Sequence, residues 1–219
     1  MENYKQEIIN RLNKISGKYS VYEVFSDWIK CSSIAISNYI TLVHDKTWKD
    51  REQDYIATIG KYSEGERKLF EEMLGLLALA LEEKQEDVLG WIYMASGIGS
   101  KAAGQFFTPY HVSELCAELT LPKADERGKY KIYEPSCGGG GMIIATASAL
   151  RKQGVNYQVD LEVVAQDLDW KGVYMCYLQL SLLGIKAVCV QGDTLKETYT
   201  GNYPKERVLY TPAKRGVLW

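Results

Sequence analysis

The chain has 219 residues, enough for one domain with a sizeable core and a smaller second domain. Its formal net charge of −2 excludes a general positive field, so any contact with nucleic acid must come from a local patch. The five cysteines are scattered and only two histidines are present, which argues for a reducing compartment and against a metal site. The N-terminus is polar and no apolar run reaches membrane-spanning length, so we expect a soluble, cytoplasmic protein with no membrane partner.

The N-terminal part of the chain shows helical periodicity, which predicts an α-helical domain over residues 1–100. Apolar side chains recur at helical spacing over residues 8–15, 21–43 and 69–81. Ser63 and Glu66 form a predicted capping box before the last of these stretches, and Asp87 is placed to cap a further helix over 88–95. We expect these apolar faces to form ordinary helix–helix core and assign them no chemistry.

A glycine-punctuated segment over residues 96–104 marks the expected boundary, so a second domain is predicted over residues 101–219. Thr108 and Pro109 predict the start of its first helix, with Thr108 as the N-cap and Pro109 at the first helical position. This helix should run to about Leu119.

Strands and helices alternate from residue 129 onward. The predicted strands are 130–134, 161–166, 186–191 and 207–210, and the predicted helices are 141–152 and 169–183. Alternation with short loops predicts a parallel sheet with right-handed crossovers. The fold class is therefore α/β, a Rossmann-like parallel sheet with flanking helices that follows an α-helical domain.

Four consecutive glycines, Gly138 to Gly141, lie between the first predicted strand and the helix that follows it. Strand, glycine turn and helix is the arrangement with which an α/β sheet holds an adenosine-bearing ligand. Glycines let the backbone come close to the ligand, and the helix N-terminus offers free N–H groups. The alternative is a tight turn without a ligand, but the entropic cost of four adjacent glycines favours the ligand site.

Acidic residues follow the predicted strands at the edge where such sheets bind ligands. Glu134 ends the first strand, Asp167 follows the second, and Asp193 follows the third. A carboxylate after the second strand is placed to accept hydrogen bonds from ribose hydroxyls, and one after the third from an adenine amino group. Asp169 also follows the second strand, but its position suits a helix cap alone.

Two adenosine-bearing ligands compete for this edge. A dinucleotide fingerprint needs a third glycine where Ile143 or Ile144 stands, and Glu134 would repel a pyrophosphate. S-adenosylmethionine carries a sulfonium and an ammonium group, which suit an acidic edge. The predicted cofactor is therefore S-adenosylmethionine, and a different Rossmann-type nucleotide binder remains the alternative.

Four segments occur in the order seen in N6-adenine DNA methyltransferases: 105–110 (QFFTPY), 134–141 (EPSCGGGG), 166–169 (QDLD) and 192–195 (GDTL). Over about residues 85–200 the chain resembles especially the modification subunits of type I restriction systems and their phage-borne relatives. The resemblance implies that the first segment packs against the methionine portion of S-adenosylmethionine and that the glycine loop cradles the cofactor. It also implies that Asp167 binds the ribose and Asp193 the adenine. The implied cofactor-binding residues are Phe106, Phe107, Thr108, Pro109, Glu134, Pro135, Ser136, Cys137, Gly138, Gly140, Asp167 and Asp193.

The chain departs from this family's pattern after the fourth predicted strand. The family carries an Asn/Asp-Pro-Pro-aromatic tetrad there, which accepts the hydrogens of the target amine and stacks on the flipped adenine. Here residues 208–214 read VLYTPAK, and the nearby string Asn202-Tyr-Pro204 has the wrong order and is predicted to be a turn. Complete sheets of this type also have about three more strands. We therefore assign no catalytic residue.

Two functions follow from this comparison. The first is a DNA methyltransferase of the adenine-N6 type, with transfer from the sulfonium to the amine of a flipped adenine. The alternative is a catalytically inactive relative that binds S-adenosylmethionine, DNA or a partner subunit without methylating. Both allow DNA, a partner subunit or self-association as partners, and neither needs a metal. The basic residues at 205, 207, 214 and 215 are interpreted as a solvated tail.

Overall fold

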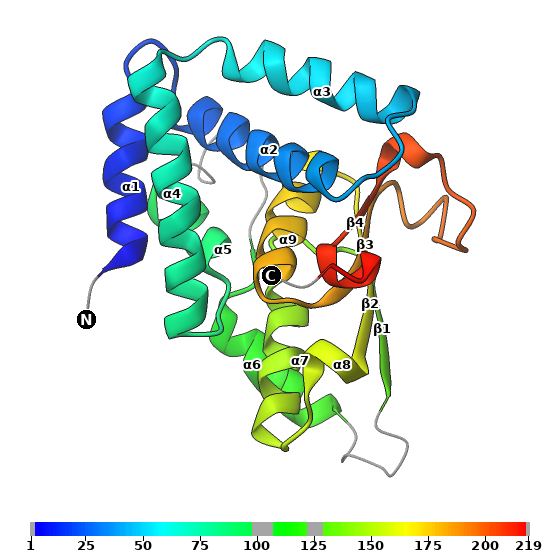
Figure 1. Ribbon diagram of the computed structural model, residues 1–219. Coiled ribbons are helices and arrows are strands. Elements are labelled where there is room, and N and C mark those ends of the chain that lie inside the picture. The colour runs from blue at the N-terminus through cyan, green and yellow to red at the C-terminus, as the bar shows by residue number, and fades with distance from the viewer. Residues whose placement is uncertain (1–2, 98–106, 122–128, 218–219) are drawn as a thin grey trace.

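The structure is a computed structural model that describes residues 3–97, 107–121 and 129–217 (Figure 1). Most of the predicted linker, and Phe106, lie outside these ranges. Five helices make up the N-terminal part: α1 (Tyr4–Ile15), α2 (Val21–Tyr39), α3 (Lys46–Ile59), α4 (Glu64–Glu83) and α5 (Val88–Ala95). The helical character predicted for this part is thus present in the described ranges.

Local sequence signals set the ends of these helices. The capping box predicted at Ser63 and Glu66 is confirmed, and a second one joins Ser20 to Glu23 at the start of α2. Asp87 caps α5 as predicted by accepting a hydrogen bond from Gly90 N. The apolar face predicted up to residue 43 is wrong at its end, because α2 stops at Tyr39, and the side chain of Tyr39 is 79% exposed.

The remaining elements follow in the order α6 (Tyr110–Thr120), β1 (Tyr130–Glu134), α7 (Gly141–Lys152), α8 (Tyr157–Asp160), β2 (Leu161–Asp167), α9 (Trp170–Leu182), β3 (Lys186–Gln191), η1 (Lys205–Arg207), β4 (Val208–Tyr210) and η2 (Pro212–Arg215).

The prediction that Thr108 caps the helix α6 is wrong. Pro109 is the N-cap residue of α6, with ψ of 132°, and its carbonyl accepts the first hydrogen bonds of this helix, from Val112 N and Ser113 N.

The strands form one sheet in the order β1-β2-β3-β4. β1, β2 and β3 are parallel as predicted, with Ile132 opposite Val163 and Ala165 opposite Cys189. β4 is antiparallel to β3, with Cys189 opposite Leu209, so the prediction that the fourth strand is parallel is wrong. The connection between β3 and β4 contains only the short helix η1, and without a crossover helix the chain returns along the edge of the sheet in the opposite direction.

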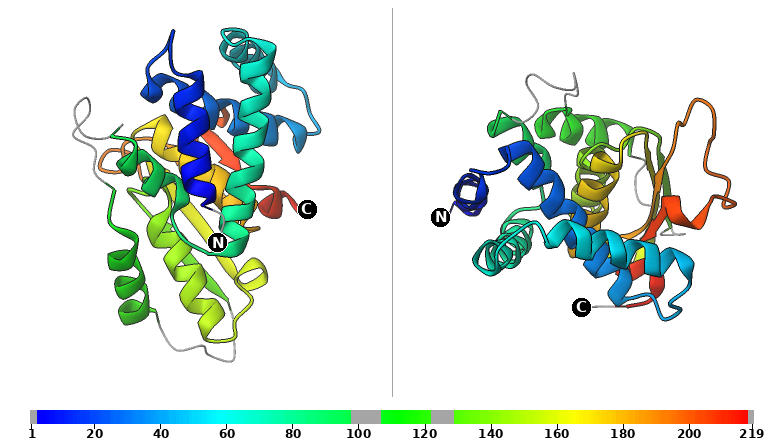
Figure 2. Two further views of the ribbon diagram at one scale, coloured as in Figure 1. Left: turned by 90° about the vertical axis from the view of Figure 1, so that its left-hand side faces the viewer. Right: turned by 90° about the horizontal axis from the view of Figure 1, so that it is seen from above.

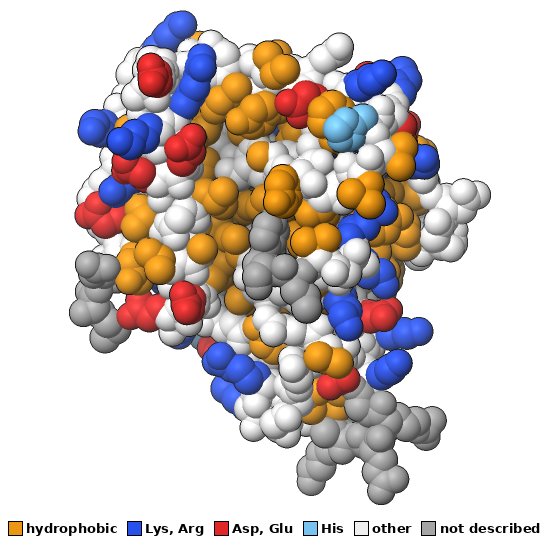
Figure 3. All heavy atoms as spheres, viewed as in Figure 1, with side chains coloured by type: hydrophobic (Ala, Val, Ile, Leu, Met, Phe, Trp, Pro, Cys, Tyr) orange, Lys and Arg blue, Asp and Glu red, His pale blue; other side chains and the backbone are white. Residues whose placement is uncertain are grey.

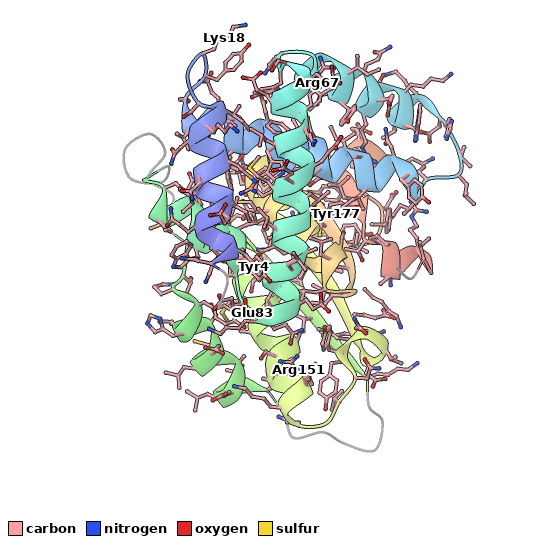
Figure 4. All side chains as sticks on the ribbon, turned by 60° about the vertical axis from the view of Figure 1, so that its left-hand side comes forward. Tyr4, Lys18, Arg67, Glu83, Arg151 and Tyr177 are labelled. Carbon is pink, nitrogen blue, oxygen red and sulfur yellow. The ribbon has the colours of Figure 1, made fainter. Side chains whose placement is uncertain are left out.

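The helices form a layer on one face of this sheet (Figures 1 and 2). α7 packs against β1, α9 packs against β2 and β3, and α2 packs on α9. Tyr177, labelled in Figure 4, projects from α9 into the middle of the molecule and is wholly buried. The predicted α/β fold with a preceding helical part is confirmed.

The opposite face of the sheet has its own small apolar cluster. Val188, Val190 and Val208 are buried there beneath three tyrosines that follow β3 or belong to β4, Tyr199, Tyr203 and Tyr210. In the view of Figure 3, charged side chains lie mostly at the rim and apolar ones gather toward the centre. Within the described ranges, no helix has the length and apolar character needed to cross a bilayer.

Arg51 of α3 ties the helical part to the fourth strand. Its guanidinium donates hydrogen bonds to the carbonyl oxygens of Lys205, at 3.1 Å, and Val208, at 2.8 Å. Burial lowers the pKa of Arg51 from its ordinary value, although the group stays charged at any physiological pH.

The basic residues near the C-terminus form ion pairs. Lys205 pairs with Asp45, Arg207 with Glu197, and Lys214 with Glu162. Lys205, Lys214 and Arg215 are exposed, in agreement with the interpretation of this segment as solvated, and the ion pairs attach it to the rest of the protein.

We expect Arg51→Ala to lower the free energy of unfolding by about 1–3 kcal/mol, because it leaves two carbonyl groups without their donor. Lys46→Ala on the same helix is the control, since the Lys46 side chain is 90% exposed and forms an exposed ion pair with Asp50. This control should change stability by less than about 0.5 kcal/mol. Urea denaturation measures both variants, and equal effects would contradict the role assigned to Arg51.

Candidate functional site

Asp167, at the carboxyl end of β2, joins the loops that follow all three parallel strands. Its Oδ2 accepts a hydrogen bond from Gly138 N at 2.8 Å, in the loop after β1. Its carbonyl accepts one from Gly192 N at 2.9 Å, in the loop after β3. Its Oδ1 accepts from Asp169 N at 3.0 Å, at the start of α9. The carboxylate is 9% exposed, and each of its oxygens can accept a further bond.

The glycine loop after β1 has a protein contact at every glycine. Gly138 and Gly140 have φ of 48° and 91°, which only glycine adopts readily. A Cβ at Gly138 would lie 2.8 Å from the ring of Phe107, and one at Gly139 would lie 3.0 Å from a carboxylate oxygen of Asp87. The four glycines are therefore explained by packing within the protein. The case for a ligand rests on the groups that surround them.

Asp87 is the buried carboxylate beneath this loop. Gln179 Nε2 donates to Asp87 Oδ1 at 2.8 Å and to the carbonyl of Gly139 at 2.7 Å, and Gln179 Oε1 accepts from Leu89 N at 3.1 Å. Burial raises the pKa of Asp87 above its ordinary value. One glutamine of α9 thus fastens the glycine loop to the first turn of α5.

Cys137 turns inward from the loop and is 6% exposed. The pKa of the neighbouring Cys176 thiol is raised well above its ordinary value, first by hydrogen bonds with Cys137 and Cys189 and then by burial. Thiols of this kind are neutral and unreactive and behave as small apolar side chains. The Cys137 side chain therefore packs in the core beneath the loop, and its backbone N–H donates to the carbonyl of Gln166 at 2.9 Å.

Asp193 lies in a tight turn after β3. Its carboxylate accepts a hydrogen bond from Leu195 N at 3.1 Å and lies 3.2 Å from Lys196 Nζ. The next residue, Thr194, donates through Oγ1 to the carbonyl of Pro135 at 2.6 Å, so this turn contacts the loop after β1 directly. The structure thereby brings Pro135, Gly138, Asp167 and Asp193 to one edge of the sheet.

The other predicted site residues differ in how closely they contact the glycine loop. Phe107 packs on Gly138 and lies edge-to-face with Tyr93, at 5.1 Å between ring centroids. Glu134 accepts from the backbone N–H of Ser136 at 3.2 Å. Thr108 and Pro109 are exposed at the start of α6. Phe106 lies outside the described residues.

The charges and backbone groups at this edge fit a ligand with a positive end and an adenosine. Glu134 and Asp167 end β1 and β2, and Asp193 follows β3. α7 begins at Gly141 with Gly140 as its N-cap residue and has no side-chain cap, and a helix N-terminus of this kind offers backbone N–H groups as donors. Among the described residues no group of three or more His, Cys, Asp or Glu side chains could hold a metal ion.

The position predicted for the catalytic tetrad lies at the opposite end of the sheet. Thr211 follows β4 and is wholly buried; its Oγ1 accepts from Ala187 N at 2.9 Å and donates to the carbonyl of Ile185 at 2.7 Å. Ile185 and Ala187 flank the amino end of β3. Because β4 is antiparallel, its carboxyl end is carried away from the glycine loop, and Thr211 stabilises the fold.

Three residues near the site have roles that the sequence analysis did not assign. Asp87 was predicted only as a helix cap, and the side chains of Gln166 and Gln179 were given no role. Both glutamines are wholly buried. A glutamine within a buried, largely apolar strand or helix is the signal that could have identified them, since a buried amide must be hydrogen-bonded.

A cavity of about 510 Å³ lies away from this site, between α1 and α4, and is lined by Asn3, Lys5, Glu83 and neighbouring residues.

The raised pKa of Asp87 gives a stability test with a definite sign. A carboxyl whose folded-state pKa is raised contributes stability at low pH that is lost as the pH rises above its ordinary pKa. We expect Asp87→Asn, which keeps the acceptor for Gly90 N, to gain stability relative to the wild type as the pH rises from about 4 to 8. Denaturant unfolding across this range measures the difference.

Asp45, the exposed N-cap of α3, is the matched control of opposite sign. The hydrogen bond from Trp48 N lowers its pKa, so its stabilising effect is present near neutral pH and is lost in acid. Asp45→Asn should therefore lose stability relative to the wild type as the pH rises. A difference for Asp87→Asn that does not vary with pH would contradict the buried-carboxylate interpretation.

Comparison with known proteins adds three findings. The model of the N-6 DNA methylase family matches residues 82–210, more than half of the chain. The fold is similar to that of a class I S-adenosylmethionine-dependent methyltransferase from Listeria monocytogenes, with a TM-score of 0.52 and 13% identity over 99% of this chain and 70% of the other. A type I restriction-modification system methyltransferase subunit from Streptococcus thermophilus gives a TM-score of 0.45 and 19% identity, over 91% of this chain and 41% of that subunit.

Proposed function

Since the chain belongs to the N-6 DNA methylase family, we propose that it binds S-adenosylmethionine at the carboxyl edge of its sheet and acts in methylation of the N6 amine of adenine in DNA. One observation carries the proposal. Loops from three neighbouring strands and the segment before α6 are in mutual contact there, through Asp167, Thr194 and Phe107. Parallel α/β sheets bind ligands at this edge.

Each contact suggests a role for a residue of this chain. Asp167, held by two backbone N–H groups, would accept from the ribose hydroxyls with its remaining lone pairs. Asp193 would accept from the adenine amino group of the cofactor. Phe107 would pack against the methionine portion, and Glu134 would face its positive charge.

The cofactor, when bound, supplies a methyl group on a sulfonium, which a nitrogen nucleophile can take up directly. The chain's part in such a transfer is to orient the donor and exclude water from it. In such a transfer the N6 amine would form the new N–CH₃ bond as the S–CH₃ bond breaks, and it would then lose one proton to solvent. S-adenosylhomocysteine is the second product.

A second function is favoured by the position of Thr211. The described residues place no Asn/Asp-Pro-Pro-aromatic tetrad beside the glycine loop, and the segment after β4 is fixed at the far end of the sheet. The alternative is therefore a catalytically inactive relative that binds S-adenosylmethionine, DNA or a partner subunit without methylating. Methylation would then require a second polypeptide that supplies the residues holding the target base.

Calorimetric titration tests cofactor binding first. We expect S-adenosylmethionine to bind and NAD not to bind, because the glycine loop is followed by Ile143 and Ile144 and carries an acidic neighbour, Glu134. Asp193→Ala should weaken binding about tenfold or more, as expected for a lost hydrogen bond to a charged acceptor. Asp50→Ala, which removes an exposed ion pair on α3, is the control. NAD binding in place of S-adenosylmethionine would refute the assignment.

Transfer of a labelled methyl group then separates the two functions. Label in the N6 position of adenine after incubation with DNA, reduced by Asp193→Ala, would establish the methyltransferase. If the cofactor binds but DNA stays unlabelled, the chain is the binding relative. Reconstitution with a candidate partner subunit would then show whether a second polypeptide restores transfer.

A further inference from the structure

Gln166 is a buried amide on the face of β2 opposite the helices. Leu161, Val163 and Ala165 point into the helical core, so Gln166 projects from the other face. Its side chain makes four hydrogen bonds and is wholly buried. Oε1 accepts from Tyr133 Oη at 2.8 Å and from Tyr199 N at 3.3 Å, while Nε2 donates to the carbonyl of Glu197 at 2.8 Å and to Tyr203 Oη at 3.3 Å.

These bonds hold the far end of the turn that carries Asp193. The Asp193 carbonyl accepts from Lys196 N at 3.0 Å and from Glu197 N at 2.7 Å, which makes residues 193–197 one compact turn. The bond from Gly192 N to the Asp167 carbonyl fixes where this turn begins. The bond from Gln166 Nε2 to the Glu197 carbonyl fixes where it ends. The Asp193 carboxylate therefore projects from a turn that is pinned on both sides.

The surroundings of Gln166 are closely packed. A Cβ at Gly192 would lie 2.1 Å from Tyr203 Oη and 3.2 Å from Gln166 Nε2, so only glycine fits beside this network. Thr194 adds a bond from the turn to the Pro135 carbonyl. Because every polar group of the Gln166 amide is used, loss of the amide leaves buried partners unsatisfied.

We propose that Gln166 is a positioning residue for the methyl donor: it holds the 193–197 turn so that the Asp193 carboxylate meets the adenine end of S-adenosylmethionine. This inference rests on the proposed function and assigns Gln166 no contact with the donor. Its effect reaches the ligand through Glu197 and Asp193. A residue of this kind determines affinity for the adenosine half and leaves recognition of the methionine half unchanged.

Gln166→Leu tests the role by removing the amide at similar size. We expect the amide hydrogens of residues 194–203 to exchange about tenfold faster, and the Kd for S-adenosylmethionine and for adenosine to rise by the same factor of about ten. Gln158→Leu is the control, because the Gln158 amide donates to the Leu183 carbonyl at 3.1 Å, near the amino end of β3. It should leave both Kd values unchanged.

Gln166→Glu provides a readout that a purely structural role would not move. Protonated, the new carboxyl can still donate to the Glu197 carbonyl; ionised, it places a charge against that carbonyl. The ratio of variant to wild-type affinity should therefore approach one near pH 5 and fall as the pH rises to 8. The titratable and charged neighbours are Tyr133 on β1, Tyr199, Tyr203 and Glu197 in the loop, Arg207, which pairs with Glu197, and Asp167 beside them. The ratio to wild type cancels their own effects.

The outcomes separate the two proposals. A wild-type protein that fails to bind S-adenosylmethionine overturns the proposed function and this inference with it. If the wild type binds and Gln166→Leu, shown folded by circular dichroism, binds equally well, the positioning role is overturned and the proposed function stands. A ratio for Gln166→Glu that does not change with pH also overturns the role.

Discussion

The bonds made by Asp167 are the constraint on which the site depends. Through its carboxylate and its carbonyl, this one residue holds the loops after β1 and β3 and the start of α9. Loops at the end of a sheet would otherwise move independently, since each is fastened only to its own strand. Asp167 makes them one unit, and the carboxylate predicted to bind the ribose is also the group that holds the surrounding loops together.

The N-terminal helices are attached to the same group of loops by side-chain hydrogen bonds. Gln179 on α9 bonds to the Asp87 carboxylate and to the Gly139 carbonyl, so the start of α5 lies directly under the glycine loop. Arg51 makes a second attachment at β4. These contacts give the N-terminal helices a physical part in holding the proposed cofactor site, although none of their side chains is assigned to the ligand.

Much of this arrangement could be predicted from the sequence, because it depends on local signals. The bounds of β1, α7 and β3 are those predicted, and Ser63, Glu66 and Asp87 cap helices as their types require. The direction of β4 could not be predicted in this way. β4 has only three residues, too few to show a pattern of alternating apolar side chains. Its direction depends on the connection that precedes it and on the hydrogen bonds of Arg51 and Thr211, which are far apart in the sequence. The roles of Gln166 and Gln179 likewise depend on contacts between distant segments.

The antiparallel β4 also changes how the missing tetrad is understood. The sequence comparison finds no tetrad around Thr211 and assigns this residue no role, whereas the structure makes it a buried support for the amino end of β3. The proposed cofactor edge and the segment after β4 lie at opposite ends of the sheet. The groups that support the proposed function are therefore those around Asp167 and Asp193, at the end of the sheet away from Thr211.

A crystal structure of the protein with S-adenosylmethionine is the most direct test of the proposed site. The electron density of the ligand should lie along the carboxyl edge of the sheet, with the ribose at Asp167, the adenine at Asp193 and the methionine portion beside Phe107. Crystals grown at saturating donor that show protein side chains filling this edge, or the donor bound elsewhere, would contradict it.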